Sequence, residues 1–334
     1  MAHANIINKK NVFERYRQQW HALLEKVVNP HIFMTPEFME SWWNTLGEGE
    51  LAIITVIQDD ELIGIAPLCI VTNSNDSLEL KFVGCKNVSD YLDFIYDPAY
   101  EDEFFETIGE ILEGTRILWE TAEFCSIPHL SITFAQLQKH TNFTFTKNQQ
   151  DVCPVVTLPQ SWDEYLANLD RKQRHEIRRK FRKIEEESTH EFKLISESSQ
   201  MPEASELFIQ LHGESSVEKA RFWDQKHKNF FKHFLQVASE KNWVRLFFLY
   251  LENRAVSTML IFDFNNQYFL YNSGYLSDQY QSLSTGSVLT AFTIKHAIER
   301  HKTHYDFLRG DEAYKFKFGA EPEAIFDITF DKQS

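Results

Sequence analysis

WVRLFFLYL (243–251), RAVSTMLIFDF (254–264) and QYFLYNSGYL (267–276) are three apolar runs that decide the fold of the second half of the chain. Each run is rich in β-branched and aromatic residues, which is typical of strands. Short polar pairs separate the runs, as expected for hairpin turns in a meander. Because helical patterns precede and follow this meander, we expect an α+β fold with a mainly antiparallel sheet flanked by helices.

The segment that follows the meander is a candidate anion site. Gln281-Ser282-Leu283-Ser284-Thr285-Gly286-Ser287 opens a helix that we expect to reach residue 301, before a short strand at 304–309. The start of a helix has free N–H groups and the positive end of the helix dipole, so it suits phosphate oxygens. Small residues would let a ligand approach the backbone. No Gly-Lys-Ser/Thr follows, so this is not a Walker loop, and an ordinary Ser/Thr cap explains the same pattern.

The first half of the chain has a similar order of elements. A strand hairpin over 51–58 and 61–72 follows two expected helices, over 11–28 and from Pro36 with Thr35 as N-cap. Its apolar run, polar pair and apolar run resemble those of 246–261. This similarity favours a duplicated α/β unit, and two unrelated domains are the alternative. We therefore expect two domains, residues 1–158 and 159–334.

The remaining expected elements complete both domains. Strands are expected at 78–84, 115–121, 152–158 and 191–196, and helices at 99–113, 128–140, 161–169, 171–187, 201–213 and 223–241.

Composition excludes several classes of protein. The chain has 334 residues, 43% of them hydrophobic, and a net charge of −15. These values are typical of globular domains and disfavour a generally basic nucleic-acid binder. The N-terminus lacks a secretory apolar core, no stretch is apolar enough to span a membrane, and no metal-site pattern occurs. Four well-separated cysteines favour reduced core thiols, so we expect a cytoplasmic protein.

The meander, small-residue turn, helix and strand together resemble the core of the GNAT acyltransferase superfamily. The pyrophosphate loop of that superfamily reads Gln/Arg-x-x-Gly-x-Gly/Ala, and here it would be Gln281-x-x-Ser284-x-Gly286. Ser284 replaces the first glycine, and we do not expect serine to take the strained φ that glycine can. The resemblance implies acetyl-CoA as donor, with the pyrophosphate at Gln281, Ser284, Thr285, Gly286 and Ser287. It also implies that a bulge at Asn272, Ser273 and Gly274 contacts the pantetheine.

A second resemblance is more specific. The stretch DFLRGDEAYK (306–315) is similar to the C-terminal motif of acetyltransferases associated with bacterial cellulose biosynthesis, which are relatives of Fem-type peptidoglycan aminoacyltransferases. The supporting matches are Phe38–Leu46 with the Gly64-x-x-Pro67-Leu68 hairpin, Ser89–Asp93, and Ser161-Trp162-x-x-Tyr165 leading to Arg178-Arg179. The resemblance covers roughly residues 33–320 and implies two GNAT-like domains.

The family implies an N-acyltransferase whose acceptor is an amine on a small molecule, polysaccharide or peptide. Such a reaction needs a proton donor for the leaving thiolate and a base for the amine. Tyr314 lies where many GNAT enzymes place a tyrosine general acid, and Asp306, Asp311 and Glu312 are candidate bases. Arg309 and Lys315 could hold an anionic substrate, and Asp90 and Asp93 of the first domain could bind the acceptor. Packing and structural ion pairs explain these residues about as well.

The helix expected at 171–187 carries a dense run of basic residues. Ile177, Phe181 and Ile184 form one apolar stripe, so the basic side chains cover the other faces. We expect Arg178 and Arg179 to meet an anionic substrate, and a solvated helix is the alternative. Two other functions remain open. One is an aminoacyl-tRNA-dependent Fem-type ligase, which alone would require nucleic acid, and the other is a catalytically silent binding module.

Overall fold

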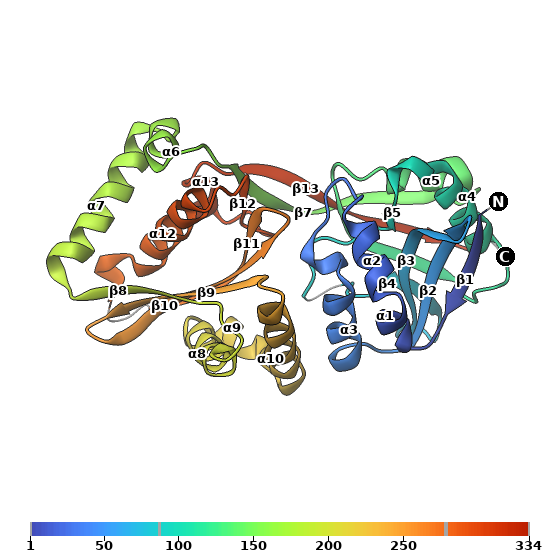
Figure 1. Cartoon of the computed structure of the whole chain (residues 1–334), viewed down its shortest axis with the longest axis horizontal. Coiled ribbons are helices and arrows are strands. Elements are labelled where there is room, and N and C mark those ends of the chain that lie inside the picture. The colour runs from blue at the N-terminus through green and yellow to red at the C-terminus, as the bar shows by residue number, and fades with distance from the viewer. Residues whose placement is uncertain (1, 86–87, 277–279, 333–334) are drawn as a thin grey trace. The chain divides into compact units, whose positions relative to one another are not determined.

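The computed structural model describes residues 2–85, 88–276 and 280–332. The chain divides into two compact units, unit 1 with residues 1–151 and 323–334, and unit 2 with residues 152–322. Both combine a mixed, mainly antiparallel sheet with helices (Figure 1), so the expected α+β class is confirmed. The domain limits expected from the sequence stay a prediction, and the two units differ from them in giving the last strand to unit 1.

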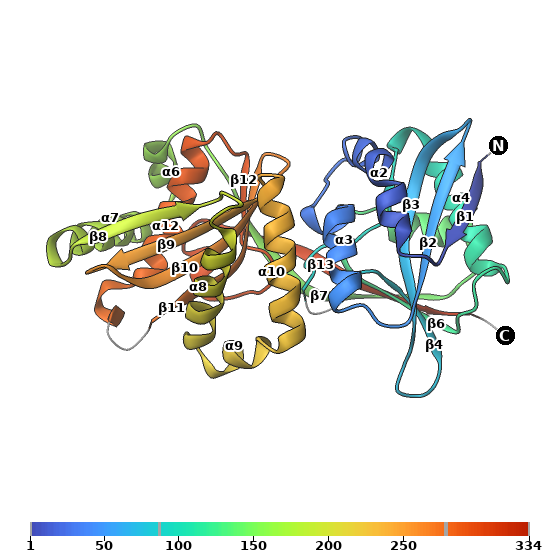
Figure 2. The same ribbon diagram turned by 60° about the horizontal axis from the view of Figure 1, so that its bottom comes forward.

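Unit 1 is built around the sheet order β1-β2-β3-β4-β6-β13, with β5 paired to β3. Figure 2 shows the long β2–β3 hairpin that the sequence predicted. Its strands are β1 (His3–Ile7), β2 (Glu50–Gln58), β3 (Glu61–Thr72), β4 (Leu78–Phe82), β5 (Ile95–Tyr96), β6 (Thr121–Pro128) and β13 (Glu321–Asp331). Its helices are α1 (Asn11–Arg15), α2 (Arg17–Leu24), η1 (Ile32–Met34), α3 (Pro36–Thr45), η2 (Pro98–Tyr100), α4 (Glu101–Glu113) and α5 (Thr133–His140).

Unit 2 has the sheet order β7-β12-β11-β10-β9-β8, and β7 (Phe145–Thr157) enters it from unit 1. In Figure 1, α8, α9 and α10 cover one face of this sheet, and α6, α7 and α12 cover the other. Its strands are β8 (His190–Ile195), β9 (Val244–Leu251), β10 (Arg254–Phe264), β11 (Gln267–Tyr275) and β12 (His304–Asp306). Its helices are α6 (Trp162–Asn168), α7 (Arg171–Glu187), α8 (Met201–Glu214), α9 (Val217–Phe222), α10 (Gln225–Glu240), η3 (Gln281–Leu283), α12 (Thr285–Glu299) and α13 (Ala313–Phe316).

Several predicted elements were wrong or missed in unit 1. The strand expected at 115–121 lies instead at β6, because Phe124, Cys125 and Ile127 are the buried residues that pack inside the sheet. The helix expected from residue 128 begins at Thr133, since Pro128 still pairs with Ile325 of β13. The sequence analysis did not identify β1 or β13. Both find a partner only through strands distant in sequence.

The cysteines also differ from expectation. Cys85 and Cys125 form a disulfide, whereas Cys69 and Cys153 are buried free thiols. The partners are far apart in sequence, and β4 and β6 bring them together. The expectation of four reduced thiols is therefore wrong for this pair, and the cysteines give no support for a cytoplasmic location. Across the described residues, none of the helices is long and apolar enough to cross a membrane.

Candidate functional site

The site lies where two parallel strands of unit 2 separate. β11 and β12 are paired from Gln267 with His304 to Phe269 with Asp306, and β12 then ends while β11 continues to Tyr275. A register shift between β10 and β11 places Tyr271 in a bulge, one residue before the expected bulge at 272–274. The space beyond the last pair opens into a cavity of about 530 Å³.

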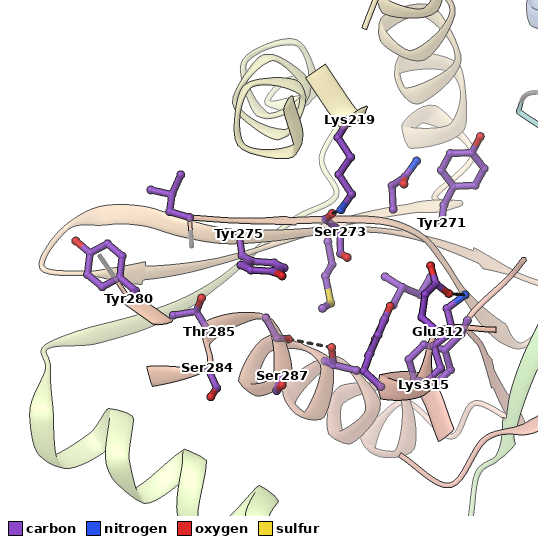
Figure 3. A pocket seen from close by; sticks show the side chains of 18 of the residues that line it. Lys219, Tyr271, Ser273, Tyr275, Tyr280, Ser284, Thr285, Ser287, Glu312 and Lys315 are labelled. Atoms are coloured by element: carbon purple, nitrogen blue, oxygen red, sulfur yellow. Dashed lines mark hydrogen bonds and ion pairs between the residues drawn. The ribbon is translucent and has the colours of Figure 1, made fainter. Parts of the chain in front are cut away.

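The cavity contains much of the predicted donor and catalytic site. The predicted residues that line it are Asn272, Ser273, Ser284, Thr285, Gly286, Ser287, Arg309, Glu312, Tyr314 and Lys315. Figure 3 shows the start of α12 on one side of β11 and Lys219 on the other. The structure thus brings residues from β11, α12 and the 306–315 segment together. The side chain of Gln281 lies outside the described part of the chain.

The start of α12 has no side-chain cap. In the same unit, Ser161, Asp170, Ser216 and Asp224 cap α6, α7, α9 and α10 with side-chain hydrogen bonds. Ser284, the N-cap of α12, makes no such bond and has φ 51° and ψ 45°. It therefore adopts the left-handed conformation, so the expectation that serine would not take this strained φ is wrong. This start leaves backbone N–H groups of the first turn for a ligand.

Tyr314 follows in α13 with its hydroxyl group turned inward. Although the residue is 37% exposed, its hydroxyl group makes a side-chain hydrogen bond with Ser273 of β11. Burial of that group raises the pKa of Tyr314 above its ordinary value, and the charge of Glu312 raises it further, while the bond with Ser273 acts in the opposite direction. The phenol therefore stays protonated at neutral pH and can donate a proton.

The segment before Tyr314 is a strained loop with several anchors. Leu308 has φ 54° and Gly310 has φ 117°. The buried ammonium of Lys315 donates to the carbonyl oxygens of Leu308, Arg309 and Gly310 at 2.9–3.1 Å and pairs with Glu312 at 2.9 Å. Such strain persists only where the surroundings over-determine it. Lys315 thus holds the loop rather than projecting as a free group for the expected substrate contact.

The three candidate bases have different environments. Asp306 is 4% exposed and accepts from the backbone N–H of Leu308 at 2.6 Å, so it shapes the turn. Asp311 is exposed and does not line the cavity. Glu312 is the predicted acid that does line it. The carboxylate of Glu312 is therefore the one of the three placed to accept a proton from a ligand there.

Two lysines that the sequence analysis did not select as site residues contact the backbone of predicted site segments, and one of them, Lys219, lines the cavity. Lys219 of α9 donates to the carbonyl oxygen of Ser273, and burial lowers its pKa, against the charges of Glu312 and Glu218. Lys183 of α7 donates to the carbonyl oxygen of Ser282, just before α12, at 3.0 Å. A helical wheel could have found Lys183, because it adjoins the apolar stripe at Ile184. No local signal identifies Lys219.

The predicted substrate residues outside the 306–315 segment do not line this cavity. Arg179 pairs with Glu176 at 2.9 Å on the exposed side of α7, and Arg178 lines other hollows. Asp90 is buried and Asp93 is half-buried in unit 1. Asp93 accepts hydrogen bonds from the backbone of Phe94 and the hydroxyl group of Thr133. Gly274 does not line the cavity either.

The parallel strands β11 and β12 thus separate beside a helix start that has no side-chain cap, and Tyr314 lines the cavity there. Residues 171–316 match the family model described as an acetyltransferase (GNAT) domain. No curated protein sequence matches the chain.

Solved structures show the same fold over nearly the whole chain. The crystal structure of FemX has a TM-score of 0.68 at 12% identity and covers 95% of this chain and 96% of its own. A conserved protein of unknown function from Bacteroides thetaiotaomicron has a TM-score of 0.61 at 12% identity, covering 98% of this chain and 100% of its own. The C-terminal domain of a putative lysylphosphatidylglycerol synthetase from Agrobacterium fabrum has 0.58 at 9%, covering 96% and 92%. At these identities the similarity shows the fold alone.

Proposed function

We propose that the protein is an N-acyltransferase that moves an acyl group, with acetyl as the first candidate, from coenzyme A to an amine acceptor. One observation carries the proposal: a single cavity joins the uncapped start of α12, the open end of β11 and the hydroxyl group of Tyr314. The cavity lies within or beside the segment that matches the acetyltransferase (GNAT) domain.

The donor would lie along β11. Its pyrophosphate would bind the free N–H groups at Thr285, Gly286 and Ser287, where the helix dipole favours negative charge. Glycine at 286 fits this arrangement, because a Cβ there would already lie 3.3 Å from the ring of Tyr275. The pantetheine would then follow the bulged part of β11 and bring the thioester toward Tyr314.

The transfer itself needs two proton movements. The acceptor nitrogen attacks the thioester carbonyl, so that a C–N bond forms and the carbonyl oxygen becomes an oxyanion. The C–S bond then breaks, and the leaving thiolate takes the proton of the Tyr314 hydroxyl group. The proton lost by the amine passes through Glu312 or water and restores the phenol. Asp306 and Lys315 would act indirectly, by holding the loop that carries Glu312 and Tyr314.

Calorimetry with acetyl-CoA, with CoA and with charged tRNA tests the donor. We expect acetyl-CoA to bind and to stabilise the protein against heat. A screen of amine pools for CoA release, with and without protein, then identifies the acceptor. Absence of binding by either coenzyme would reject the proposal. Binding without turnover on any amine would favour a silent binding module.

A second candidate is an aminoacyl-tRNA-dependent ligase. The observation that favours it is a basic hollow on α7, lined by Arg171, Lys172, Arg174, His175 and Arg178. Each phosphate contact adds about −0.9 to the log–log slope of duplex binding against salt. We expect weak tRNA binding and no dependence of activity on tRNA. Tight, steeply salt-dependent binding that is lost when Arg174 and Arg178 are neutralised would reverse the ranking.

Three narrower statements stay predictions. They are the link to cellulose biosynthesis, the cytoplasmic location, and acceptor binding by Asp90, Asp93, Arg178 or Arg179. A CoA-bound structure with acceptor would test the last, because it would show which of these side chains the acceptor touches.

A further inference from the structure

Three side chains form a hydrogen-bonded chain that ends at the cavity. The indole Nε1 of Trp223 donates to Nδ1 of His212 at 2.9 Å, and Nε2 of His212 lies 3.1 Å from Oδ1 of Asn272. Trp223 follows α9, His212 lies in α8 and Asn272 lies in β11. The first two residues are 7% and 2% exposed, and the third lines the cavity. The chain therefore links a buried indole to the ligand space.

The chemistry of the three side chains decides which atom donates and which accepts in each of these hydrogen bonds. An indole N–H can only donate, so Nδ1 of His212 must be the unprotonated acceptor. In the neutral ring Nε2 then carries the proton and donates to Oδ1 of Asn272. Burial and, to a smaller extent, the nearby charge of Lys219 lower the pKa of His212 to about 3, against the hydrogen bond with Asn272. The ring is therefore neutral at physiological pH.

The orientation of the Asn272 carboxamide follows from that tautomer. Turning the amide over would point its NH₂ group at the Nε2–H of His212, donor against donor. Within the described part of the chain, no side chain or backbone group accepts from Nδ2 of Asn272. The two Nδ2 protons are therefore left for a ligand in the cavity.

Gly274 makes this arrangement sterically possible. A Cβ at residue 274 would lie 2.6 Å from the Cα of His212 and 2.8 Å from the carbonyl oxygen of Leu211. Glycine thus lets α8 approach β11 closely enough for His212 to reach Asn272. This packing role differs from the pantetheine contact expected for Gly274.

We propose that Trp223 and His212 are positioning residues that hold the Asn272 carboxamide with Nδ2 turned into the cavity, where it donates to the carbonyl oxygen of the acyl thioester. The inference rests on the proposed acyl transfer. Asn272 and Tyr314 both line the cavity, so a thioester beside Tyr314 lies in the space that the Asn272 carboxamide borders. A fixed neutral donor stabilises the developing oxyanion without reorganisation.

The test compares acetyl-CoA with S-ethyl-CoA, which differ at the carbonyl oxygen. Calorimetry on the full chain should show that the wild-type protein prefers acetyl-CoA by about 2- to 10-fold, the range of one hydrogen bond. Asn272→Asp keeps the oxygen that accepts from His212 and removes the Nδ2 donor, so the preference should disappear. Trp223→Phe should reduce it, because His212 is then free to change tautomer. Trp162→Phe, which removes an indole away from the cavity, should leave it unchanged.

Nitrogen-15 spectra of the histidine side chains give a readout that a packing role would not move. We expect His212 as the Nε2–H tautomer, without titration between pH 5 and 8, and a changed signature in Trp223→Phe. The inference is overturned if His212 carries its proton on Nδ1, or if a folded Asn272→Asp protein keeps the wild-type preference. Failure of the proposed function would differ, since the wild-type protein would then bind neither coenzyme.

Discussion

Units 1 and 2 contain the same strand–helix–strand arrangement. In unit 1, β3 pairs antiparallel with β4, and β4 pairs parallel with β6 after a crossover that contains α4. In unit 2, β10 pairs antiparallel with β11, and β11 pairs parallel with β12 after α12. The equivalence favours the duplication suggested by the sequence. The two crossover helices nevertheless begin in opposite ways.

The first turn of α4 contains Glu101, Asp102 and Glu103, whereas α12 begins with Thr285, Gly286 and Ser287. The acidic turn satisfies the helix dipole internally and repels phosphate. The small-residue turn leaves both the dipole and the N–H groups to a ligand. The same backbone arrangement therefore carries the proposed anion site in unit 2 and a helix with an acidic first turn in unit 1.

The space beside the two helices differs as well. Phe104 and Phe105 of α4 pack with Phe94 at ring distances of 5.8 Å, and Phe94 also contacts Phe82 and Phe124. A Cβ on Gly64 would lie 2.1 Å from the ring of Phe104, so glycine admits that ring. The corresponding residues of α12 are Val288 and Leu289. The comparison teaches that two units with the same topology can differ in the space beside the crossover helix, because large aromatic side chains fill it in unit 1 and smaller aliphatic ones stand at the matching positions in unit 2.

The largest expected effect concerns Tyr314, the proposed proton donor of unit 2. Tyr314→Phe keeps the ring and removes the proton donor, so kcat should fall by about 10²- to 10⁴-fold while acetyl-CoA affinity changes little. Steady-state kinetics measures both values. Tyr250→Phe, in β9, serves as the control and should behave as wild type. A loss of less than about threefold in Tyr314→Phe would make the residue a packing group.

An acidic first turn in α12, like that of α4, should weaken the binding of acetyl-CoA. Ser287→Glu places a carboxylate beside the proposed pyrophosphate position, so acetyl-CoA affinity should fall by about 10- to 100-fold through like-charge repulsion. The melting temperature should hold or rise, since an acid in the first turn favours the helix. Ser287→Gln matches the size without the charge and should bind more tightly than Ser287→Glu. Equal affinities for the two variants would place the phosphates elsewhere.

The stability of unit 1 should depend on pH through Asp93. Burial raises the pKa of Asp93 to about 6, against hydrogen bonds from Ser131, Thr133 and Phe94. A raised carboxyl pKa means that its stabilising contribution is present below pH ~4 and is lost as pH rises through ~6. Asp93→Asn should therefore raise the unfolding free energy at pH 7.5 by ~1–3 kcal/mol and have little effect near pH 4. Denaturant titrations at both pH values measure this. The exposed Asp163→Asn is the control, and an unchanged pH dependence in Asp93→Asn would contradict the prediction.

The smallest effect concerns the backbone of the α12 start. Ser284 has φ 51°, a conformation that costs about 1 kcal/mol or more for a residue with a Cβ. Ser284→Gly removes that strain but adds freedom to the unfolded chain, so the unfolding free energy should rise by less than about 1 kcal/mol. Ser287→Gly lies in ordinary helix and should lower it instead. Thermal unfolding of the two variants compares the signs, and a loss of stability in Ser284→Gly would show that the serine side chain matters there.

Local pattern predicted the elements of unit 2 well because their signals are local. The alternating runs became β9, β10 and β11, and the small-residue segment became the start of α12. The apolar stripe of α7 is confirmed by the burial of Ile177 and Ile184. In unit 1, local pattern did not predict β6 and β13 correctly, because each is defined by pairing with a strand distant in the sequence.

The candidate site was only partly predictable. Residues in the turn and in DFLRGDEAYK could be selected because short motifs carry them. The basic side chains near the site were less predictable, since the sequence of a basic run on α7 does not indicate which side chain turns toward α12. The structure turns Lys183 there and pairs Arg179 with Glu176.

By itself, the sequence determined the α+β class, the meander, the small-residue helix start and the tyrosine that follows β12, because each depends on residues close along the chain. Only the tertiary structure decided that Lys315 anchors a strained loop, that Gly274 admits α8, and that His212 meets Asn272 across 60 positions of sequence. The physical reason is that such contacts depend on how closely elements pack, and packing is set by side-chain volume summed over many distant residues. The hydrophobic periodicity of a strand (two residues) or of a helix (3.6 residues) depends on residues close along the chain, so it does not report that summed volume.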